Sequence, residues 1–276
     1  MRAILLFLFL ILDVSCLEIP GIDVSTHQKT IDWKTVAKTK KFAIIRAGYG
    51  KGTIDDFWEK NYKGAKAAGM KVGAYWYSYA TSVEVAKQEA KSFVKALEGK
   101  QLEWPVYYDI EDQSIFDNNL QNSIAKAFCD ILESHKYFCG IYSSASPLIY
   151  NFNSDVKNSY TIWVAHYGVS KPSYSGAYGI WQTGYGKVDG INGDCDLDIW
   201  YTDFESIIKN IGYNGFGSGS ESETKPEGCN GKTVYEIAKE VIQEKWGNGQ
   251  DRINQLTAAG CDYETIQEEV NRILGL

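Results

Sequence analysis

The chain has 276 residues, of which 44% are hydrophobic and 23% are charged. This composition is typical of a globular protein, and the length suffices for one large domain and one small domain. The net charge is −7, with no basic stripe, which argues against nucleic acid and anionic membrane surfaces as partners. The eight Trp and nineteen Tyr residues mostly serve packing, but flat aromatic faces also suit sugar rings.

The N-terminus has the pattern of a cleaved secretory signal over residues 1–16. Arg2 precedes an apolar run at 3–12, which is shorter than the roughly 20 residues that a membrane-spanning helix needs. A lipoprotein signal acylated at Cys16 is the weaker alternative, because Asp13 stands where an apolar residue is wanted. We therefore expect a chain without a membrane span that is secreted, or that enters the lumen of a digestive or lysosomal compartment.

Residues 17–210 alternate short apolar runs with amphipathic stretches. The predicted strands are 19–24, 42–47, 71–77, 106–110, 138–142, 161–165 and 178–182, with a last short strand near Leu197. The predicted helices are 55–68, 83–97 and 119–135. This alternation favours a parallel α/β fold, and the number of strands favours a compact barrel. The second half has few long helices, so we expect an irregular TIM-like β/α barrel.

The composition changes after the predicted barrel. Residues 211–228 are rich in Gly, Ser, Glu and Asn, which predicts a flexible linker. The stretch 233–274 then has the apolar spacing of two or three helices, with a turn at 246–249. We expect residues 229–276 to form a small all-α three-helix bundle, which at this size is only marginally stable on its own.

Five cysteines remain after removal of the signal. Cys129 and Cys139 lie on a predicted helix and on the strand that follows it, which makes a feasible pair. Cys229 and Cys261 bracket the C-terminal segment and could staple it, which leaves Cys195 unpaired. Spacing does not decide this connectivity. The cysteine spacings do not resemble a zinc site, and we expect neither a metal nor a cofactor.

The fourth predicted strand ends in a cluster of acidic residues. Because strand side chains alternate between faces, Tyr107, Asp109 and Glu111 point one way, while Tyr108 and Ile110 point toward the helices. Two carboxylates would then lie at the C-terminal end of a barrel strand, where barrel enzymes build their sites. Neighbouring carboxylates do not ionise independently, so one of them keeps a proton near neutral pH. Glycoside hydrolysis needs such an acid beside a group that supports a positive sugar carbon.

Acidic residues on other strands strengthen this prediction. An acidic pair alone often marks a solvated loop or a helix cap. Here, however, Asp23 ends the first predicted strand, and Asp196 and Asp198 lie in the last one. The first and last strands of a closed barrel are neighbours, so carboxylates from three strands would meet at one mouth.

The motifs resemble glycoside hydrolase family 25, the Chalaropsis-type lysozymes. The matching segments follow the family's order and are 21–25, 27–28, 31–33, 42–47, 73–77, 109–111, 140–143, 162–165, 180–182 and 196–197. The resemblance implies a barrel that hydrolyses the β-1,4 bond between N-acetylmuramic acid and N-acetylglucosamine in bacterial peptidoglycan, with retention. It thus implies an antibacterial or wall-degrading enzyme, and we expect a monomer.

By position, the resemblance implies that Glu111 is the general acid. Asp109 is expected to stabilise the charged intermediate or to orient the acetamido group of the substrate, while Asp23 and Asp196 line the site. An enzyme ester and an oxazolinium both remain open as intermediates. The residues expected to contact sugar are Tyr75, Tyr77, Tyr107, Tyr142, Trp163 and Gln182.

Three positions need separate comment. Family members usually carry Asn where this chain has Asp198, and often Arg where it has His166. We expect His166 to be a hydrogen-bonding residue at the edge of the cleft, and His27 to be structural.

The C-terminal segment resembles a cell-wall-binding repeat of phage endolysins. The matching residues are 238, 241–242, 245–249, 252, 256, 259–260, 262–263 and 270–271. The resemblance implies wall binding, with Trp246, Asn248 and Arg252 as candidate contacts. The alternative is a helical bundle without a ligand.

Other functions stay open at this point. A wall-binding protein with an inactive barrel would keep the fold without the chemistry, and a chitinase-like enzyme would share the carboxylates. A zinc amidase is disfavoured because the chain has three His residues, and a cysteine peptidase because no cysteine lies at a predicted strand end.

Overall fold

The computed structural model describes residues 18–217 and 229–274. The predicted signal at 1–16 and most of the predicted linker lie outside this part of the chain. Over the described ranges, no helix combines the length and apolar character that crossing a membrane requires.

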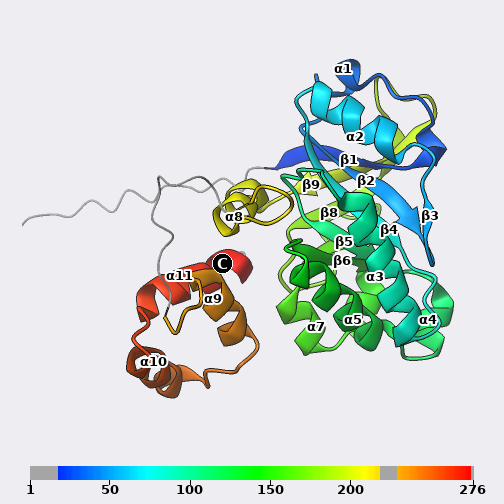
Figure 1. The fold of residues 1–276 in the computed structure, drawn as a ribbon. Helices are drawn as coiled ribbons and strands as arrows, with labels where there is room; N and C mark the ends of the chain where they lie inside the picture. The colour runs from blue at the N-terminus through cyan, green and yellow to red at the C-terminus, as the bar shows by residue number, and fades with distance from the viewer. Residues whose placement is uncertain (1–17, 218–228, 275–276) are drawn as a thin grey trace, which may run out of the picture.

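Eight strands of the described residues form a closed barrel (Figure 1). They are β1 (Ile19–Val24), β2 (Phe42–Tyr49), β4 (Lys71–Tyr77), β5 (Val106–Asp109), β6 (Cys139–Ser144), β7 (Thr161–Ala165), β8 (Ile180–Lys187) and β9 (Asp194–Trp200). The strand order is β1-β9-β8-β7-β6-β5-β4-β2, and pairing of β1 with β2 closes the ring. The short β3 (Thr53–Ile54) pairs with the end of β2. The predicted barrel is confirmed.

One strand breaks the parallel arrangement. β9 runs antiparallel to both of its neighbours, β8 and β1, so the prediction of a parallel sheet is wrong at this point. The cause is the connection between β8 and β9, which spans only residues 188–193. A parallel crossover needs a dozen or more residues, whereas a short turn returns the chain antiparallel.

Helices cover the outside of the barrel. They are α1 (Trp33–Val36), α2 (Trp58–Ala67), α3 (Val83–Leu97), α4 (Gln113–Asp117), α5 (Gln121–Ser134), α6 (Ala145–Tyr150), α7 (Ser154–Ser159) and α8 (Phe204–Ile211), with a 3-10 turn at Thr26–Gln28. The bounds predicted for α3 are confirmed, and Ser82 caps its first turn by accepting a hydrogen bond from the amide of Val85. The shorter helices escaped prediction because four to eight residues show little periodicity.

The barrel strands separate two apolar layers. On the outside, the Tyr108 ring stacks on Phe128 of α5 with centroids 3.7 Å apart. On the inside, Tyr107 meets Trp163 of β7 edge to face at 5.3 Å. The predicted alternation of β5 is thereby confirmed. Large aromatic rings fill the barrel interior and form a rigid floor beneath its mouth.

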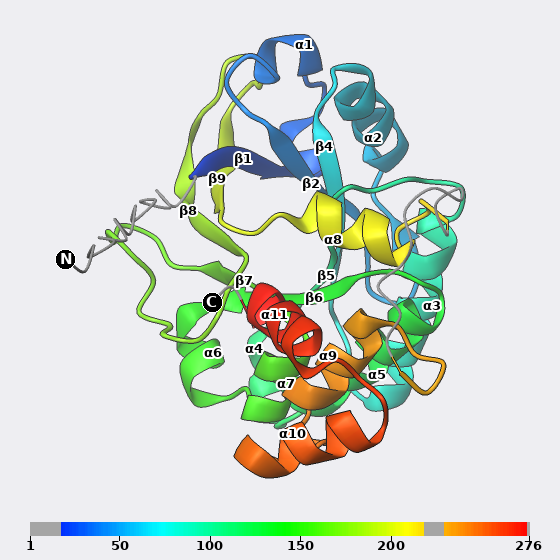
Figure 2. The ribbon, with the colours of Figure 1, turned by 90° about the vertical axis from the view of Figure 1, so that its left-hand side faces the viewer.

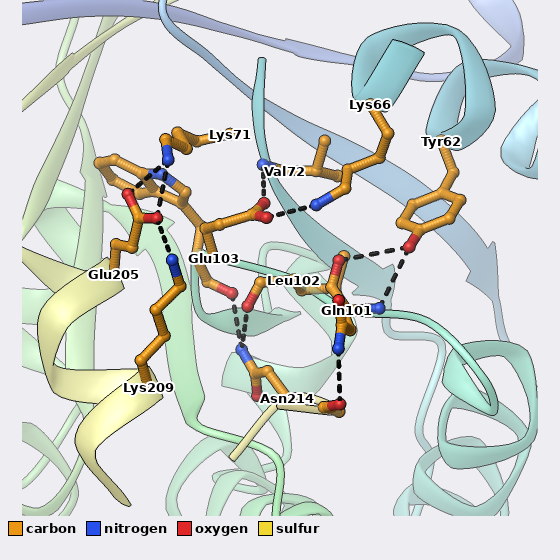
Figure 3. A network of polar contacts seen from close by, with 12 residues as sticks. Tyr62, Lys66, Lys71, Val72, Gln101, Leu102, Glu103, Glu205, Lys209 and Asn214 are labelled. Carbon is orange, nitrogen blue, oxygen red and sulfur yellow. Dashed lines mark hydrogen bonds and ion pairs between the residues drawn. The ribbon is translucent and has the colours of Figure 1, made fainter. Parts of the chain in front are cut away.

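A polar network closes the end of the barrel where the parallel strands begin (Figure 3). Glu103 accepts a hydrogen bond from the amide of Val72 and forms an ion pair with Lys66. Glu205 of α8 forms an ion pair with Lys71 at 2.6 Å, which joins α8 to β4. The ion pair between Lys71 and Glu205 fixes α8 against the barrel.

Asn214 extends the barrel beyond α8. It is fully buried, its side-chain nitrogen donates to the carbonyls of Leu102 and Trp104, and its side-chain oxygen accepts from the amide of Phe138. Residues 212–216 therefore belong to the barrel, and the predicted linker at 211–228 begins too early. Its Gly- and Asn-rich composition predicted a linker, but the segment forms a turn in which Asn214 adopts a φ of 52°.

Three helices form the C-terminal domain, as predicted: α9 (Val234–Ile242), α10 (Gly249–Ala258) and α11 (Tyr263–Leu274). A disulfide joins Cys229 to Cys261, and Cys195 is a free, buried thiol, which is one of the arrangements that the sequence left open. The sulfur atoms of Cys129 and Cys139 lie 2.7 Å apart, so the expected neighbours do meet, but both thiols are free.

The helical domain packs against the barrel at the end where the parallel strands begin (Figure 2). The ring of Tyr235 on α9 lies 5.9 Å from that of Phe138, which directly precedes β6. Lys239 forms a 2.5 Å ion pair with Glu133 of α5. Because β5 ends at Asp109, this docking surface lies at the opposite end of the barrel from the predicted acidic cluster.

Candidate active site

The predicted acidic residues meet in a pocket of about 360 Å³ at the C-terminal ends of the parallel strands. We call it the inner pocket. Asp23 comes from β1, Asp109 from the last position of β5, and Asp196 from the beginning of β9. Because β9 is antiparallel, its beginning lies at the mouth, and Asp23 is the direct cross-strand partner of Asp196. The complete lining is Asp23, Ser25, His27, Gln28, Arg46, Tyr75, Tyr77, Asp109, Glu111, Tyr142, Trp163, Tyr167, Gln182 and Asp196.

Asp109 and Glu111 differ in depth. Asp109 is 4% exposed, and within the described residues its buried Oδ1 atom has no hydrogen-bond partner. Glu111 follows the end of β5 and lies exposed at the mouth. Asp109 is thus placed to meet a substrate deep in the pocket, and Glu111 to meet the bond at its rim.

Both carboxyls have raised pKa values. Desolvation raises the pKa of Asp109 well above its usual range, the charge of Glu111 raises it further, and Arg46 lowers it. The pKa of Glu111 is raised by desolvation and then by the charge of Asp196. The raised pKa values favour retention of a proton by the pair, which an acid catalyst needs. Arg46 acts against this rise and so favours the charged form of Asp109.

Gln182 of β8 fixes the position of the Asp23 carboxylate by hydrogen bonding. Its Nε2 atom donates to Asp23 Oδ2 at 2.6 Å, while its Oε1 atom accepts from the hydroxyls of Tyr142 at 2.8 Å and Tyr167 at 2.5 Å. Desolvation and the charges of Asp198 and Asp196 raise the pKa of Asp23, and the Gln182 hydrogen bond opposes them.

Asp198 lies beneath the pocket rather than in its lining. It is 2% exposed and accepts a hydrogen bond from Trp163 Nε1 at 2.9 Å, while its other oxygen is buried without a partner among the described residues. Burial raises the pKa of Asp198 to about 8, although the Trp163 hydrogen bond lowers it. The departure from Asn noted in the sequence therefore places a titratable group beneath the site and outside the lining of the pocket.

The structure places nearly all of the predicted sugar contacts in the inner pocket. Tyr75, Tyr77, Tyr142, Trp163 and Gln182 line it. Tyr107 does not, and its expected contact with sugar is not supported. It is fully buried in the barrel interior, because it lies two residues before Asp109 on the same face of β5 and so one layer deeper.

Several pocket residues were missed from the sequence. Arg46 interrupts the apolar run of β2 and binds Asp55 through Nε at 2.8 Å. That interruption is a usable sequence signal, since a charged residue among buried neighbours needs a partner. Tyr167 lies in an irregular loop and gave no signal. His27, expected to be structural, lines the pocket, where it opposes the desolvation that raises the pKa of Asp196.

The remaining predicted residues lie outside this pocket. His166 is at the edge of the cleft, as expected, and its Nδ1 accepts a hydrogen bond from the amide of Ser173 at 3.0 Å. In the helical domain, Trp246 donates to Glu240, and Arg252 donates to the carbonyl of Gly247 and the side chain of Asn248. Trp246, Asn248 and Arg252 thus cluster around the turn between α9 and α10.

Comparisons with known proteins match both parts of the chain. The family model described as glycosyl hydrolases family 25 matches residues 22–191, and the CW_7 repeat model matches residues 235–274. The uncharacterized protein YegX of Escherichia coli K12 is 32% identical over 199 residues, which cover 68% of this chain and 72% of that protein. The autolytic lysozyme of Clostridium acetobutylicum is 32% identical over 183 residues, which cover 64% and 54% of the two chains.

Solved structures agree with the barrel. The CTP1L endolysin aligns with a TM-score of 0.61 and 26% identity, covering 69% of each chain. The bacterial lysozyme from Streptomyces coelicolor aligns with a TM-score of 0.61 and 25% identity, covering 72% of this chain and 98% of that one. With the convergent carboxylates, these matches show that the chain belongs to family 25 of the glycosyl hydrolases and is a glycoside hydrolase that also contains a CW_7 repeat.

Proposed function

We propose that the protein is an exported, monomeric lysozyme. It hydrolyses the β-1,4 bond between N-acetylmuramic acid and N-acetylglucosamine of bacterial peptidoglycan, with retention. The observation that carries the proposal is the placement of a deeply buried Asp109 at the end of β5 and of an exposed Glu111 two residues later at the mouth of the pocket. The relatives named lysozyme support the choice of substrate.

The chemistry follows from the two positions. Glu111 gives its proton to the oxygen between the two sugars, and that bond then breaks without expulsion of a strongly basic alkoxide. The sugar left behind gains positive charge, which the buried Asp109 stabilises in a site of low dielectric. Glu111 then accepts a proton from the incoming water. Retention is proposed from the resemblance to the family, and Asp109 and Glu111 supply the two carboxyl groups that a retaining enzyme uses.

The helical repeat supports a second part of the proposal. We infer that it binds the cell wall, which raises the local concentration of the enzyme at its substrate. The cluster at Trp246, Asn248 and Arg252 lies on the turn between α9 and α10 and supplies an aromatic ring and a cation for that role. A bundle without a ligand would show no affinity for purified walls.

The deciding experiment is digestion of purified peptidoglycan, with the new chain ends identified by mass spectrometry. We expect reducing muramic acid ends, and their loss in Glu111→Gln by a factor of about 10² to 10⁴. Cleaved peptide stems would indicate an amidase or peptidase instead, and turnover of chitin a chitinase-like enzyme. Binding to walls without any cleavage would indicate an inactive barrel. Folding of Glu111→Gln is checked by its unfolding midpoint.

A further inference from the structure

A second pocket adjoins the inner pocket on the side of Glu111. Its volume is about 710 Å³, within the range of about 300–1,000 Å³ that small-molecule sites occupy. Glu111, Tyr142 and Tyr167 line both pockets. The two pockets therefore form one continuous cleft, and the carboxyl of Glu111 stands at the boundary between them.

The two halves of the cleft differ in charge. The inner pocket carries Asp23, Asp109, Asp196 and Arg46. In the second pocket, the described lining residues include no Asp, Lys or Arg, and Glu111 is their single carboxylate. The sugar that gains positive charge needs carboxylates around it, so it lies in the inner pocket. The leaving sugar stays neutral throughout the reaction and needs none.

The position of the acid then orients the substrate. A proton from Glu111 goes to the oxygen that joins the two sugars, so this oxygen lies at the boundary of the pockets. One sugar must then lie on each side of Glu111. Since the inner pocket takes the sugar that becomes charged, the second pocket receives the leaving part of the glycan strand.

The walls of the second pocket suit a sugar. Helix α6 contributes Ala145, Ile149 and Tyr150, and the Tyr150 side chain is 81% exposed. Ser146 and Ser173 add hydroxyl groups, which complement the polar rim of a pyranose ring. An exposed aromatic face beside hydroxyl groups matches the apolar face and polar edge of an N-acetylhexosamine.

We propose that the second pocket is the leaving-group subsite and that the ring of Tyr150 is its stacking platform. The proposal rests on the muramidase function proposed above and deepens it. The described lining offers no Lys or Arg to pair with a carboxylate, and its His166 already uses Nδ1 to accept from the amide of Ser173. The pocket therefore accepts the neutral N-acetylglucosamine unit rather than the lactyl group of N-acetylmuramic acid. Tyr150 thus helps to determine which glycosidic bond is placed beside Glu111.

The test compares two substrates that share the same inner-pocket sugar. One is the peptidoglycan strand, which fills both pockets, and the other is the disaccharide fluoride ending in N-acetylmuramic acid, whose leaving group is too small to reach Tyr150. We expect Tyr150→Ala to lower kcat/KM about tenfold on the strand and to leave the fluoride unchanged. The matched control Tyr150→Phe keeps the ring and should retain activity on both.

Equal losses on both substrates, or no loss on the strand, would overturn the proposal. If the unmodified enzyme does not cleave peptidoglycan, the muramidase proposal fails, and the subsite is then tested by binding. In that case, calorimetry with chitotriose on Glu111→Gln should show affinity about tenfold weaker after Tyr150→Ala but not after Tyr150→Phe. Unchanged chitotriose affinity would reject the subsite.

Discussion

Gln182 and Asp23 are joined by a hydrogen bond of 2.6 Å, although their strands β8 and β1 do not pair with each other and are separated by β9. The orientation of the Gln182 amide is fixed from behind, because Tyr142 and Tyr167 both donate to its oxygen. Its nitrogen must therefore face Asp23. One amide thus positions a buried carboxylate from across an intervening strand.

Replacing Gln182 by Leu should lower kcat/KM strongly and the free energy of unfolding only moderately. Without the amide, Asp23 loses its hydrogen bond and its position, and misplaced groups in an active site cost rate factors of about a hundred. The unpaired Tyr142 hydroxyl and Asp23 should cost about 2 kcal/mol of unfolding free energy. Measurements of kcat/KM and urea unfolding check both numbers, with Gln101→Leu on the surface as the matched control. Full activity in Gln182→Leu would show that Asp23 needs no such support.

The pH dependence of activity should follow the proton on Glu111. Desolvation and the charge of Asp196 raise its pKa, so the protonated acid persists to higher pH than an ordinary glutamate would allow. Activity should therefore fall as the pH rises through this raised pKa.

Asp196→Asn removes the charge that contributes to this shift. We expect the alkaline limb of the kcat/KM profile to move to lower pH, with the maximum reduced less than tenfold. Asp194→Asn, an exposed neighbour on β9, is the control and should leave the profile in place. If the alkaline limb of the profile stays at the same pH or moves to higher pH in Asp196→Asn, Glu111 is not the acid whose titration the profile reports.

The elements that could be predicted from the sequence are those with strong local patterns. The strand 71–77 has the predicted bounds because it is a continuous buried run, and the helix 83–97 has them because it keeps a helical period over its whole length. The convergence of Asp23, Asp109 and Asp196 could also be predicted, since it needs only the C-terminal ends of barrel strands and ring closure.

What could not be predicted depends on contacts between distant segments. The direction of β9 is decided by a six-residue connection, and Asn214 is buried through contacts with residues more than 70 positions away. The burial of Tyr107 could not be predicted, because it depends on how far β5 extends into the barrel. Tyr150 gave no signal, because an exposed aromatic residue is distinguished only by the pocket beside it.

Asp198 should make stability fall with rising pH. Its pKa is raised to about 8 in the folded protein, against roughly 3.9 in an unfolded chain. Between these values the folded state keeps a proton that the unfolded state releases, so each increase in pH favours unfolding. The loss is complete once the pH exceeds the folded-state pKa.

Asp198→Asn should therefore stabilise the protein at pH 8 by several kcal/mol and have little effect at pH 4. The amide oxygen can still accept the hydrogen bond from Trp163, so the packing is preserved. Urea unfolding at both pH values measures the difference, with the exposed Asp189→Asn as control. A gain of equal size at both pH values would mean that ionisation of Asp198 is not the cause.

Reduction of the Cys229–Cys261 disulfide should unfold the helical domain before the barrel. The bond closes a loop with a sequence separation of 32, which constrains the unfolded chain by about 4 kcal/mol, a large share of the stability of so small a bundle. Hydrogen exchange after treatment with dithiothreitol should show protection lost over α9–α11 and kept over β1–β9. Cleavage of soluble glycan should persist, because the domain docks through Tyr235 and Lys239 at the end of the barrel opposite Glu111.

The double variant Cys229→Ser, Cys261→Ser should match the reduced protein and no longer respond to dithiothreitol. Simultaneous loss of protection in both parts would instead mean that docking, and not the disulfide, holds the helices, and that barrel and repeat unfold as one unit.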